Sequence, residues 1–137
     1  MILVIGGAFQ GKTEYAQKTY QKREWMDCEQ VDWYDCDSVQ KIIEIICGFS
    51  GILHFEKVIR YMVEAKIDYS AFAEMIIEKC SDTIFTIQEV GYGVVPIDAK
   101  DREYREAVGR IATKLAAYSN QVVRVVCGIG TVIKNEK

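Results

Sequence analysis

Glycine, lysine and threonine follow the first apolar run of the chain at the spacing of a phosphate-binding loop. The segment GGAFQGKT contains the pattern Gly-x4-Gly-Lys-Thr over residues 6–13, between a short apolar stretch and a candidate helix. Glycines allow backbone N–H groups to converge on phosphate oxygens, Lys12 can reach the β- and γ-phosphates, and the Thr13 hydroxyl can bind Mg²⁺. An ordinary tight turn is the competing interpretation, but the strand–helix context favours phosphate binding. The predicted nucleotide-binding residues are Gly6, Gly7, Ala8, Phe9, Gln10, Gly11, Lys12, Thr13 and Glu14.

Phosphoryl transfer also requires a carboxylate at the end of a strand, to bind Mg²⁺ or to orient the attacking hydroxyl. Glu89 follows the β-rich segment TIFTIQ and is the first candidate, both as a catalytic residue and as a metal ligand. A structural carboxylate that holds the following glycine loop is the alternative. Asp35, in WYDCDS, is a second candidate metal ligand, but it is equally compatible with capping the next helix.

The segments that must position these residues alternate between β-rich and helical patterns. Strands are predicted at residues 1–5, 31–34, 52–55, 83–90 and 122–127, and helices at 14–22, 39–47, from 56 onward, 69–79 and 102–118. This alternation predicts an α/β fold in one domain covering residues 1–137. With the phosphate-loop motif, the expectation is a P-loop NTPase-like, three-layer fold with a mostly parallel five-stranded sheet.

Glycines follow three of the predicted strands. Gly6 and Gly7 follow the first strand, residues 91 and 93 follow the fourth, and residues 128 and 130 follow the fifth. The carboxyl ends of strands line the ligand crevice in open parallel sheets. The glycines therefore predict that one edge of the sheet leaves room for a ligand.

Composition argues against several classes of partner. The net charge is −3 and no run of Lys or Arg exceeds two residues, so no nucleic-acid partner is expected. No apolar run has the length of a membrane span, and no signal peptide is visible, so we expect a cytoplasmic protein. The five cysteines lack a C-x-x-C spacing and are expected to be reduced and mostly buried.

Three further segments, QEVGYGVVP, DREYREAVGRIATKLA and VVCGIGTVIK, together with GGAFQGKT, resemble one family. It is the adenosylcobinamide kinase/adenosylcobinamide-phosphate guanylyltransferase family, whose hallmarks are GGARSGKS, NEVGxGIVP, GRxNQxLA and SGIGxxIK. The resemblance covers roughly the first twenty and the last fifty-five residues, whereas residues 23–80 align ambiguously. It implies phosphorylation of the aminopropanol hydroxyl of adenosylcobinamide by ATP or GTP with Mg²⁺. It also implies GMP transfer through a guanylylated histidine, and a homo-oligomer.

The sequence departs from this family where the histidine is expected. The family places its histidine in a His-x-x-x-Arg-Pro-like segment, which this chain lacks. His54, in ILHFEK, is the sole histidine and remains a catalytic candidate, although the pattern favours a packed or hydrogen-bonded structural histidine. The resemblance therefore implies an adenosylcobinamide kinase and leaves guanylyl transfer in question. The alternative is a catalytically degenerate nucleotide-binding paralogue that acts as a regulatory or scaffold module.

Overall fold

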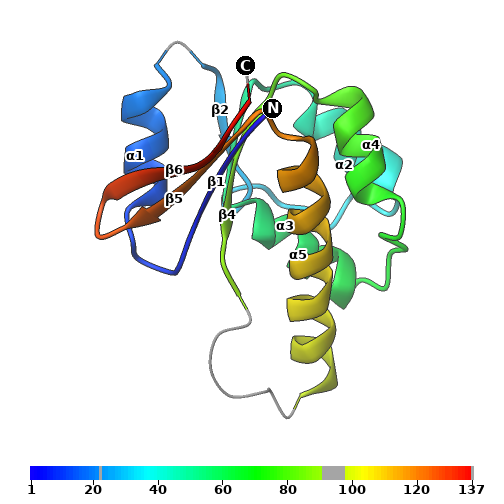
Figure 1. Ribbon diagram of the computed structural model, residues 1–137. Coiled ribbons are helices and arrows are strands. Elements are labelled where there is room, and N and C mark those ends of the chain that lie inside the picture. Colours follow the sequence, from blue (N-terminus) through cyan, green and yellow to red (C-terminus); the bar gives the residue numbers. More distant parts are fainter. Residues whose placement is uncertain (22, 91–97, 137) are drawn as a thin grey trace.

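The computed structural model describes residues 1–21, 23–90 and 98–136, which form one six-stranded sheet with helices on both of its faces (Figure 1). The strands are β1 (Ile2–Gly6), β2 (Trp25–Asp27), β3 (Gly51–Leu53), β4 (Ile84–Gln88), β5 (Gln121–Val126) and β6 (Ile129–Asn135). The helices are α1 (Lys12–Thr19), α2 (Val39–Ile46), α3 (Phe55–Glu64), α4 (Phe72–Lys79) and α5 (Ala99–Tyr118).

The strand order is β2-β3-β4-β1-β5-β6, and every neighbouring pair is parallel except β5 and β6. This arrangement confirms the predicted α/β fold with a mostly parallel sheet. Because β1 to β4 are parallel, their carboxyl ends meet at one edge of the sheet. That edge carries the phosphate-loop motif, which begins at Gly6 at the end of β1.

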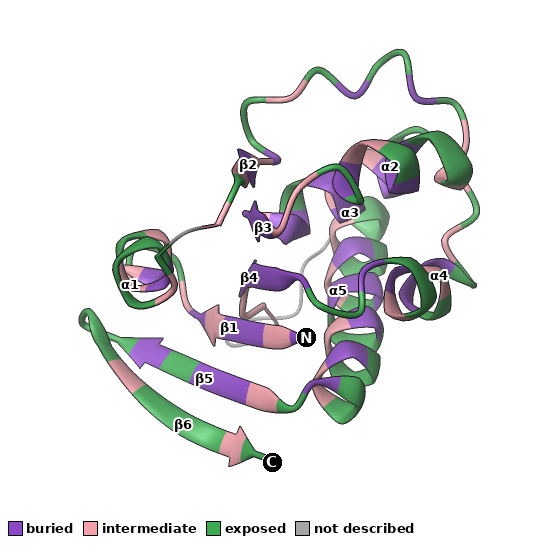
Figure 2. Ribbon diagram, turned by 90° about the horizontal axis from the view of Figure 1, so that it is seen from above, coloured by how far each residue is buried: buried purple, intermediate pink, exposed green. Residues whose placement is uncertain are grey.

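The helices divide unequally between the two faces, as Figure 2 shows: α1 covers one face, and α2 to α5 cover the other. The larger core lies on the side of α2 to α5, where the ring of Phe55 stacks on Phe72 at 5.6 Å and meets Phe85 edge-on at 4.8 Å. A smaller apolar cluster under α1 includes Val4, Ala16 and other buried residues of β4 and β5. These layers agree with the predicted three-layer fold.

The number of strands differs from the expected five because the chain reverses after β5. Cys127 and Gly128 adopt left-handed backbone conformations, with φ of 52° and 76°, and β6 then pairs with β5 antiparallel. Most residues of β6 are exposed, so the segment lacks the alternation of a half-buried strand that would reveal it in the sequence.

The predicted strand over residues 31–34 is wrong. Asp32 accepts a hydrogen bond from the backbone N–H of Tyr34 at 3.0 Å, which makes a local turn, and the buried Trp33 donates from Nε1 to the carbonyl of Cys28 at 2.9 Å. The second strand lies earlier, at β2, where the ring of Trp25 covers Gly51 of β3. The packing of the Trp25 side chain against β3 therefore fixes the position of the second strand.

The helices lie close to the predicted ones, with ends set by local capping. Ser38 caps α2 by accepting from the N–H of Lys41 at 3.4 Å, and Asp98 caps α5 by accepting from two N–H groups. None of the helices in the described part of the chain combines the length and the apolar composition that crossing a bilayer requires.

Candidate functional site

The loop between β1 and α1 has the compact geometry that its glycines permit. A Cβ at Gly6 would lie 2.6 Å from the carbonyl oxygen of Val125, so no larger residue fits without movement of the backbone. Gly11 adopts a left-handed conformation with φ of 89° directly before α1 begins at Lys12. Residues 6–13 therefore form a strand–loop–helix unit whose helix amino terminus faces the loop, as the phosphate-loop motif requires.

The hairpin of β5 and β6 braces this loop through Gln10. The side-chain Oε1 of Gln10 accepts from the backbone N–H of Cys127 at 2.7 Å, and its carbonyl accepts from the N–H of Gly128 at 2.8 Å. A Cβ at Gly11 would lie 3.2 Å from the Cα of Gly128, so the two backbones are closely packed. Phe9, in contrast, has a φ of 61° and a fully exposed side chain. Gln10 thus holds the shape of the loop.

Lys12 lies under the loop, and its ammonium group donates to the carbonyl oxygen of Gly7 at 2.6 Å. The residue is only 8% exposed. Burial lowers the pKa of Lys12, and the negative charges of Glu56 and Glu89 oppose that shift. A buried ammonium group with one carbonyl partner keeps two further N–H donors for an anion.

Lys12 shares a pocket of about 480 Å³ with residues from the ends of three other strands. The loop and α1 contribute one wall, and the segments that follow β2, β3 and β4 contribute the other. The lining residues are Ala8, Phe9, Gly11, Lys12, Thr13, Glu14, Gln17, Glu29, His54, Glu56, Lys57 and Gln88. Lys12 and five other predicted nucleotide-binding residues therefore line one cavity.

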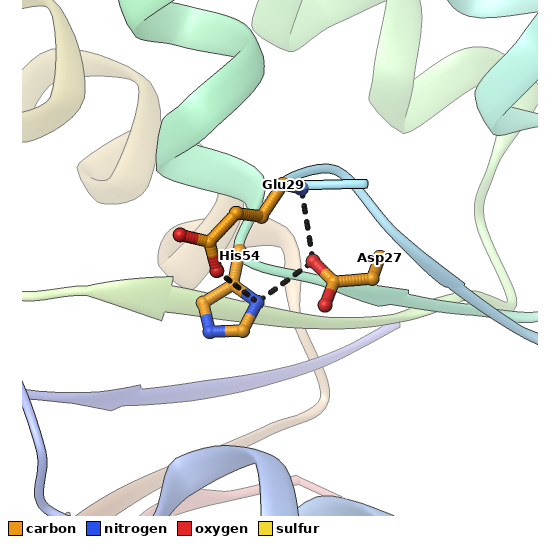
Figure 3. A group of neighbouring side chains, drawn as sticks. All are labelled: Asp27, Glu29 and His54. Atoms are coloured by element: carbon orange, nitrogen blue, oxygen red, sulfur yellow. Dashed lines mark hydrogen bonds and ion pairs between the residues drawn. The ribbon is translucent and has the colours of Figure 1, made fainter. Parts of the chain in front are cut away.

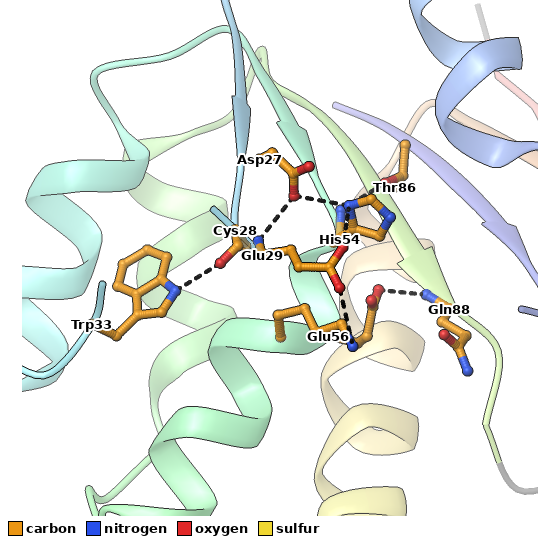
Figure 4. A network of polar contacts seen from close by, with 9 residues as sticks. Asp27, Cys28, Glu29, Trp33, His54, Glu56, Thr86 and Gln88 are labelled. Carbon is orange, nitrogen blue, oxygen red and sulfur yellow. Dashed lines mark hydrogen bonds and ion pairs between the residues drawn. The ribbon is translucent and has the colours of Figure 1, made fainter. Parts of the chain in front are cut away.

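Glu56 is a buried carboxylate of this pocket that no sequence motif identifies. Its carboxylate is 1% exposed, and Oε1 accepts from the backbone N–H of Gln88 at 2.9 Å (Figure 4). Its Oε2 atom is buried with no hydrogen-bond partner among the described residues. A carboxylate oxygen without a partner at this depth is costly unless a cation or a donor occupies the space beside it. The available signal is an acidic residue just after a strand, in ILHFEK.

His54 lies at the end of β3, held between two neighbouring strands. Its φ of 55° is left-handed, and its backbone N–H donates to Oγ1 of Thr86 at 2.9 Å. Its Nδ1 atom lies 2.8 Å from Oδ1 of Asp27, which also accepts from the N–H of Glu29 at 2.9 Å (Figure 3). Because an ionised carboxylate can only accept, this contact places a proton on Nδ1.

The arrangement of Asp27 and His54 has two chemical uses. With Nδ1 protonated, the Nε2 atom of the neutral ring carries the lone pair and can act as a base or a nucleophile. Alternatively, Asp27, Glu29 and His54 each offer one ligand atom, all within 4.8 Å of one another, for a divalent cation. The two uses exclude each other, because a cation on Nδ1 would replace the proton there.

Glu89 and Asp35 do not line this pocket. Oε1 of Glu89 accepts from Nε of Arg124 at 2.9 Å, and the carboxylate lines a neighbouring cavity of about 420 Å³ beside α5. Its backbone N–H nevertheless donates to the carbonyl of Gly6 at 2.8 Å, so it borders the loop. Asp35 is exposed in the segment between β2 and α2, beside the cap residue Ser38. The expected glycine loop at residues 91–93, with Pro96, lies outside the described residues.

The pocket offers two oxygen groups that suit Mg²⁺. The hydroxyl of Thr13 and the unpartnered Oε2 of Glu56 both belong to residues that line it. Hard oxygen ligands of this kind, completed by phosphate oxygens and water, are those that Mg²⁺ prefers. The donor set therefore fits a magnesium nucleotide, whereas Glu89 and Asp35, the metal ligands expected from the sequence, lie outside the lining of this pocket.

Comparison with protein families identifies a match to this chain. A family model described as cobinamide kinase / cobinamide phosphate guanyltransferase matches residues 41–133, which is more than half of the chain. The matched range begins after α1, so it does not include the phosphate loop. The geometry of the loop is therefore evidence separate from the family match.

Two curated relatives match a shorter part of the chain. The bifunctional adenosylcobalamin biosynthesis protein CobU of Escherichia coli (strain K12) is 40% identical over 58 residues, which is 42% of this chain and 32% of that protein. Its counterpart in Salmonella typhimurium (strain LT2) is 38% identical over the same share of each chain. The match thus spans about a third of the length of these relatives.

Among solved structures, the crystal structure of the flagellar accessory protein FlaH from Methanocaldococcus jannaschii superposes with a TM-score of 0.51. The superposition covers 98% of this chain and 78% of that chain, at 9% sequence identity. At this identity the likeness supports the α/β fold alone.

Proposed function

Because the chain belongs to the cobinamide kinase / cobinamide phosphate guanyltransferase family, we propose that it is a nucleoside-triphosphate-dependent adenosylcobinamide kinase. The proposed donor is ATP or GTP with Mg²⁺, and the proposed acceptor is the aminopropanol hydroxyl of the corrinoid. One observation carries the proposal: the lysine, hydroxyl and carboxylate that phosphoryl transfer requires, from Lys12, Thr13 and Glu56, line one pocket.

The loop and Lys12 are proposed to bind the phosphates. Backbone N–H groups of residues 7–13 and the amino terminus of α1 favour negative charge in the loop. The Lys12 ammonium, which donates to Gly7, has lost much of its hydration through burial, so phosphate oxygens are strong additional partners for it. Binding of a polyphosphate would therefore satisfy donors that the chain already holds in place.

Thr13 and Glu56 are proposed to hold Mg²⁺, which neutralises developing charge on the transferred phosphoryl group when bound. Alternatively, the unpartnered Oε2 of Glu56 accepts a hydrogen bond from the attacking hydroxyl, a role that replaces direct coordination of the ion by that oxygen. In the reaction, the acceptor oxygen forms a bond to the γ-phosphorus and the bond to the bridging oxygen breaks. The nucleoside diphosphate leaves, and the hydroxyl proton passes to the carboxylate or to water.

The test is phosphorylation of adenosylcobinamide with γ-labelled ATP or GTP. We expect labelled adenosylcobinamide phosphate, and we expect Glu56→Gln to lower its rate of formation by roughly 100-fold, whereas nucleotide should still bind because the loop and Lys12 are retained. Glu44→Gln, at an exposed position of α2, is the matched control and should retain the wild-type rate. Tight nucleotide binding without any labelled corrinoid would overturn the kinase and favour the regulatory or scaffold module.

A second activity, guanylyl transfer, is proposed for His54. It is favoured by the contact between Nδ1 of His54 and Asp27, which leaves Nε2 with the lone pair in a residue that lines the same pocket. Nε2 would form a bond to the α-phosphorus of GTP, pyrophosphate would leave, and GMP would then pass to the phosphate of the corrinoid.

Labelling with α-labelled GTP tests this second activity. An acid-labile covalent GMP adduct is expected on the chain and should be absent from His54→Ala. If the kinase turns over and no adduct forms, His54 has a structural role and the chain is a kinase alone.

A further inference from the structure

Two cysteines meet at the edge of the sheet opposite the phosphate loop. Cys47 follows the last residue of α2, and Cys80 follows the last residue of α4. Their Sγ atoms lie 2.8 Å apart. Because Cys47 precedes β3 and Cys80 precedes β4, both stand where these parallel strands begin, whereas the phosphate loop stands where β1 ends.

Backbone hydrogen bonds fix both cysteine residues at the ends of their helices. The N–H of Cys47 donates to the carbonyl of Ile43 at 2.9 Å, and that of Cys80 donates to Ile76 at 2.7 Å. A covalent disulfide has an S–S distance of about 2.05 Å, so the two atoms need to approach by less than about 1 Å to bond. Side-chain rotation can supply a movement of this size.

The two thiols differ in their access to solvent. Cys47 is exposed, whereas Cys80 is 3% exposed, and both line a pocket of about 550 Å³ together with Arg23 and Lys79. Burial, together with the neighbouring sulfur of Cys47, raises the pKa of Cys80. A reagent that enters the pocket therefore meets Cys47 first, and Cys80 stands beside it as the resolving thiol.

We propose that Cys47 and Cys80 are a site of reversible thiol–disulfide exchange with a small-molecule disulfide such as oxidised glutathione. The Cys47 thiolate attacks one sulfur of glutathione disulfide, which releases one glutathione thiolate and leaves a mixed disulfide on Cys47. Sγ of Cys80 then attacks Sγ of Cys47 and loses its proton in this step, the bond from Cys47 to glutathione breaks, and the second glutathione leaves as the thiol. In total, the two cysteines are oxidised, one glutathione disulfide is reduced to two thiols, and the two protons are distributed between glutathione and solvent.

The bond would join α2 to α4 without reaching the phosphate pocket. The two cysteines are 33 residues apart in the sequence, so closing this loop restricts the unfolded chain. We expect the oxidised form to unfold at a Tm higher by on the order of 10 °C. Nucleotide binding should be the same in both forms, so failure of this proposal and failure of the kinase proposal are distinguishable.

The experiment uses the full chain with Cys127→Ser, which removes the other exposed thiol. The reduced protein is treated with oxidised glutathione, and intact mass, free thiols and Tm are measured. We expect loss of the mass of two hydrogens, loss of two thiols and the rise in Tm. In this background, Cys80→Ser should stop at the mixed disulfide on Cys47, and Cys47→Ser should keep all its thiols.

Three results would overturn the proposal. The first is retention of all thiols in the Cys127→Ser protein, and the second is a stable mixed disulfide on Cys47 that never closes. The third is oxidation that proceeds equally in Cys47→Ser, which would place the reactive thiols elsewhere. Because Cys47 is exposed, its replacement by serine should leave the fold intact and keep this comparison interpretable.

Discussion

Lys12 and Glu56 contribute opposite charges to the same pocket, but only one of them is recognisable in the sequence. The spacing of the glycines around Lys12 identifies it, because the phosphate-loop motif fixes its position relative to the strand and the helix. Glu56 is one of 20 acidic residues, and its only signal, a position just after a β-rich segment, is one that it shares with Glu89. It lies in the first turn of α3, directly after the left-handed backbone of His54 that joins β3 to this helix. The left-handed turn at His54 depends on contacts with the rest of the fold. The residue types around it are therefore not enough to predict it.

Removal of the Lys12 ammonium should weaken phosphate binding. We expect Lys12→Ala to weaken the affinity for ATP or GTP by at least about 10-fold, because the ammonium is the one cation that the loop itself supplies. Titration calorimetry with magnesium nucleotide measures the effect. Lys18→Ala, at an exposed position of the same helix, should bind as wild type. Equal binding by the two variants would show that nucleotide binds elsewhere.

Asp27→Asn should change which nitrogen of His54 carries the proton. The amide of asparagine can donate to Nδ1, so the ring would shift toward the form protonated on Nε2. Nitrogen-15 NMR reads this directly, since the chain has a single histidine. Glu29→Gln, whose carboxylate lies 4.0 Å from Nδ1, should change the spectrum little. An unchanged ring in Asp27→Asn would rule out the orienting role of Asp27.

At the scale of elements, the sequence predicts the helices and the buried strands well and the edges of the sheet poorly. β1 and β4 are continuous apolar or β-branched runs, because parallel strands in the centre are buried on both faces. β2 has three residues and depends on Trp25 packing over Gly51, and β6 is exposed along most of its length. Neither edge strand has a local pattern that would distinguish it from a loop.

The β5–β6 hairpin and the phosphate loop should behave as one unit through Gln10. Gln10→Ala removes the bond to the N–H of Cys127 and leaves that donor to water, so the loop loses one of its two fixed contacts with the hairpin. We expect nucleotide affinity to fall by about 3–10-fold, equivalent to the roughly 1 kcal/mol of a typical hydrogen bond. Gln40→Ala, exposed on α2, is the control for calorimetry. An unaltered affinity in Gln10→Ala would mean that the hairpin does not shape the loop.

At the scale of the whole molecule, α3 and α5 pack together over the sheet, and Tyr104 lies between them. Its ring is buried under the guanidinium of Arg60, with 3.8 Å from Cζ to the ring centroid. Burial raises the pKa of Tyr104 to about 12, the charge of Glu56 acts in the same direction, and Arg60 opposes them. The folded chain therefore favours the neutral phenol.

This shift predicts how stability depends on alkaline pH. The unfolded chain loses the phenol proton near pH 10, and the folded chain keeps it until about pH 12, so the stabilisation is complete below pH 10. It is lost progressively as pH rises between these values. Denaturant titration at a series of pH values measures the free energy of unfolding, and Tyr104→Phe should reduce its dependence on pH in this range. Tyr118 is 45% exposed, and Tyr118→Phe should leave that dependence unchanged. Identical slopes in all three proteins would contradict the prediction.

Self-association, expected from the family resemblance, stays a prediction that sedimentation can test.

The position of β1 has a consequence for how this chain acquires its shape. The strand that comes first in the sequence ends up in the middle of the sheet, hydrogen-bonded on one side to residues 84–88 and on the other to residues 121–124. Its pairing must wait for partners that are far away along the chain, and such distant contacts slow folding. The phosphate loop, although its motif occupies only eight residues, can form only after nearly the entire polypeptide has collapsed around it.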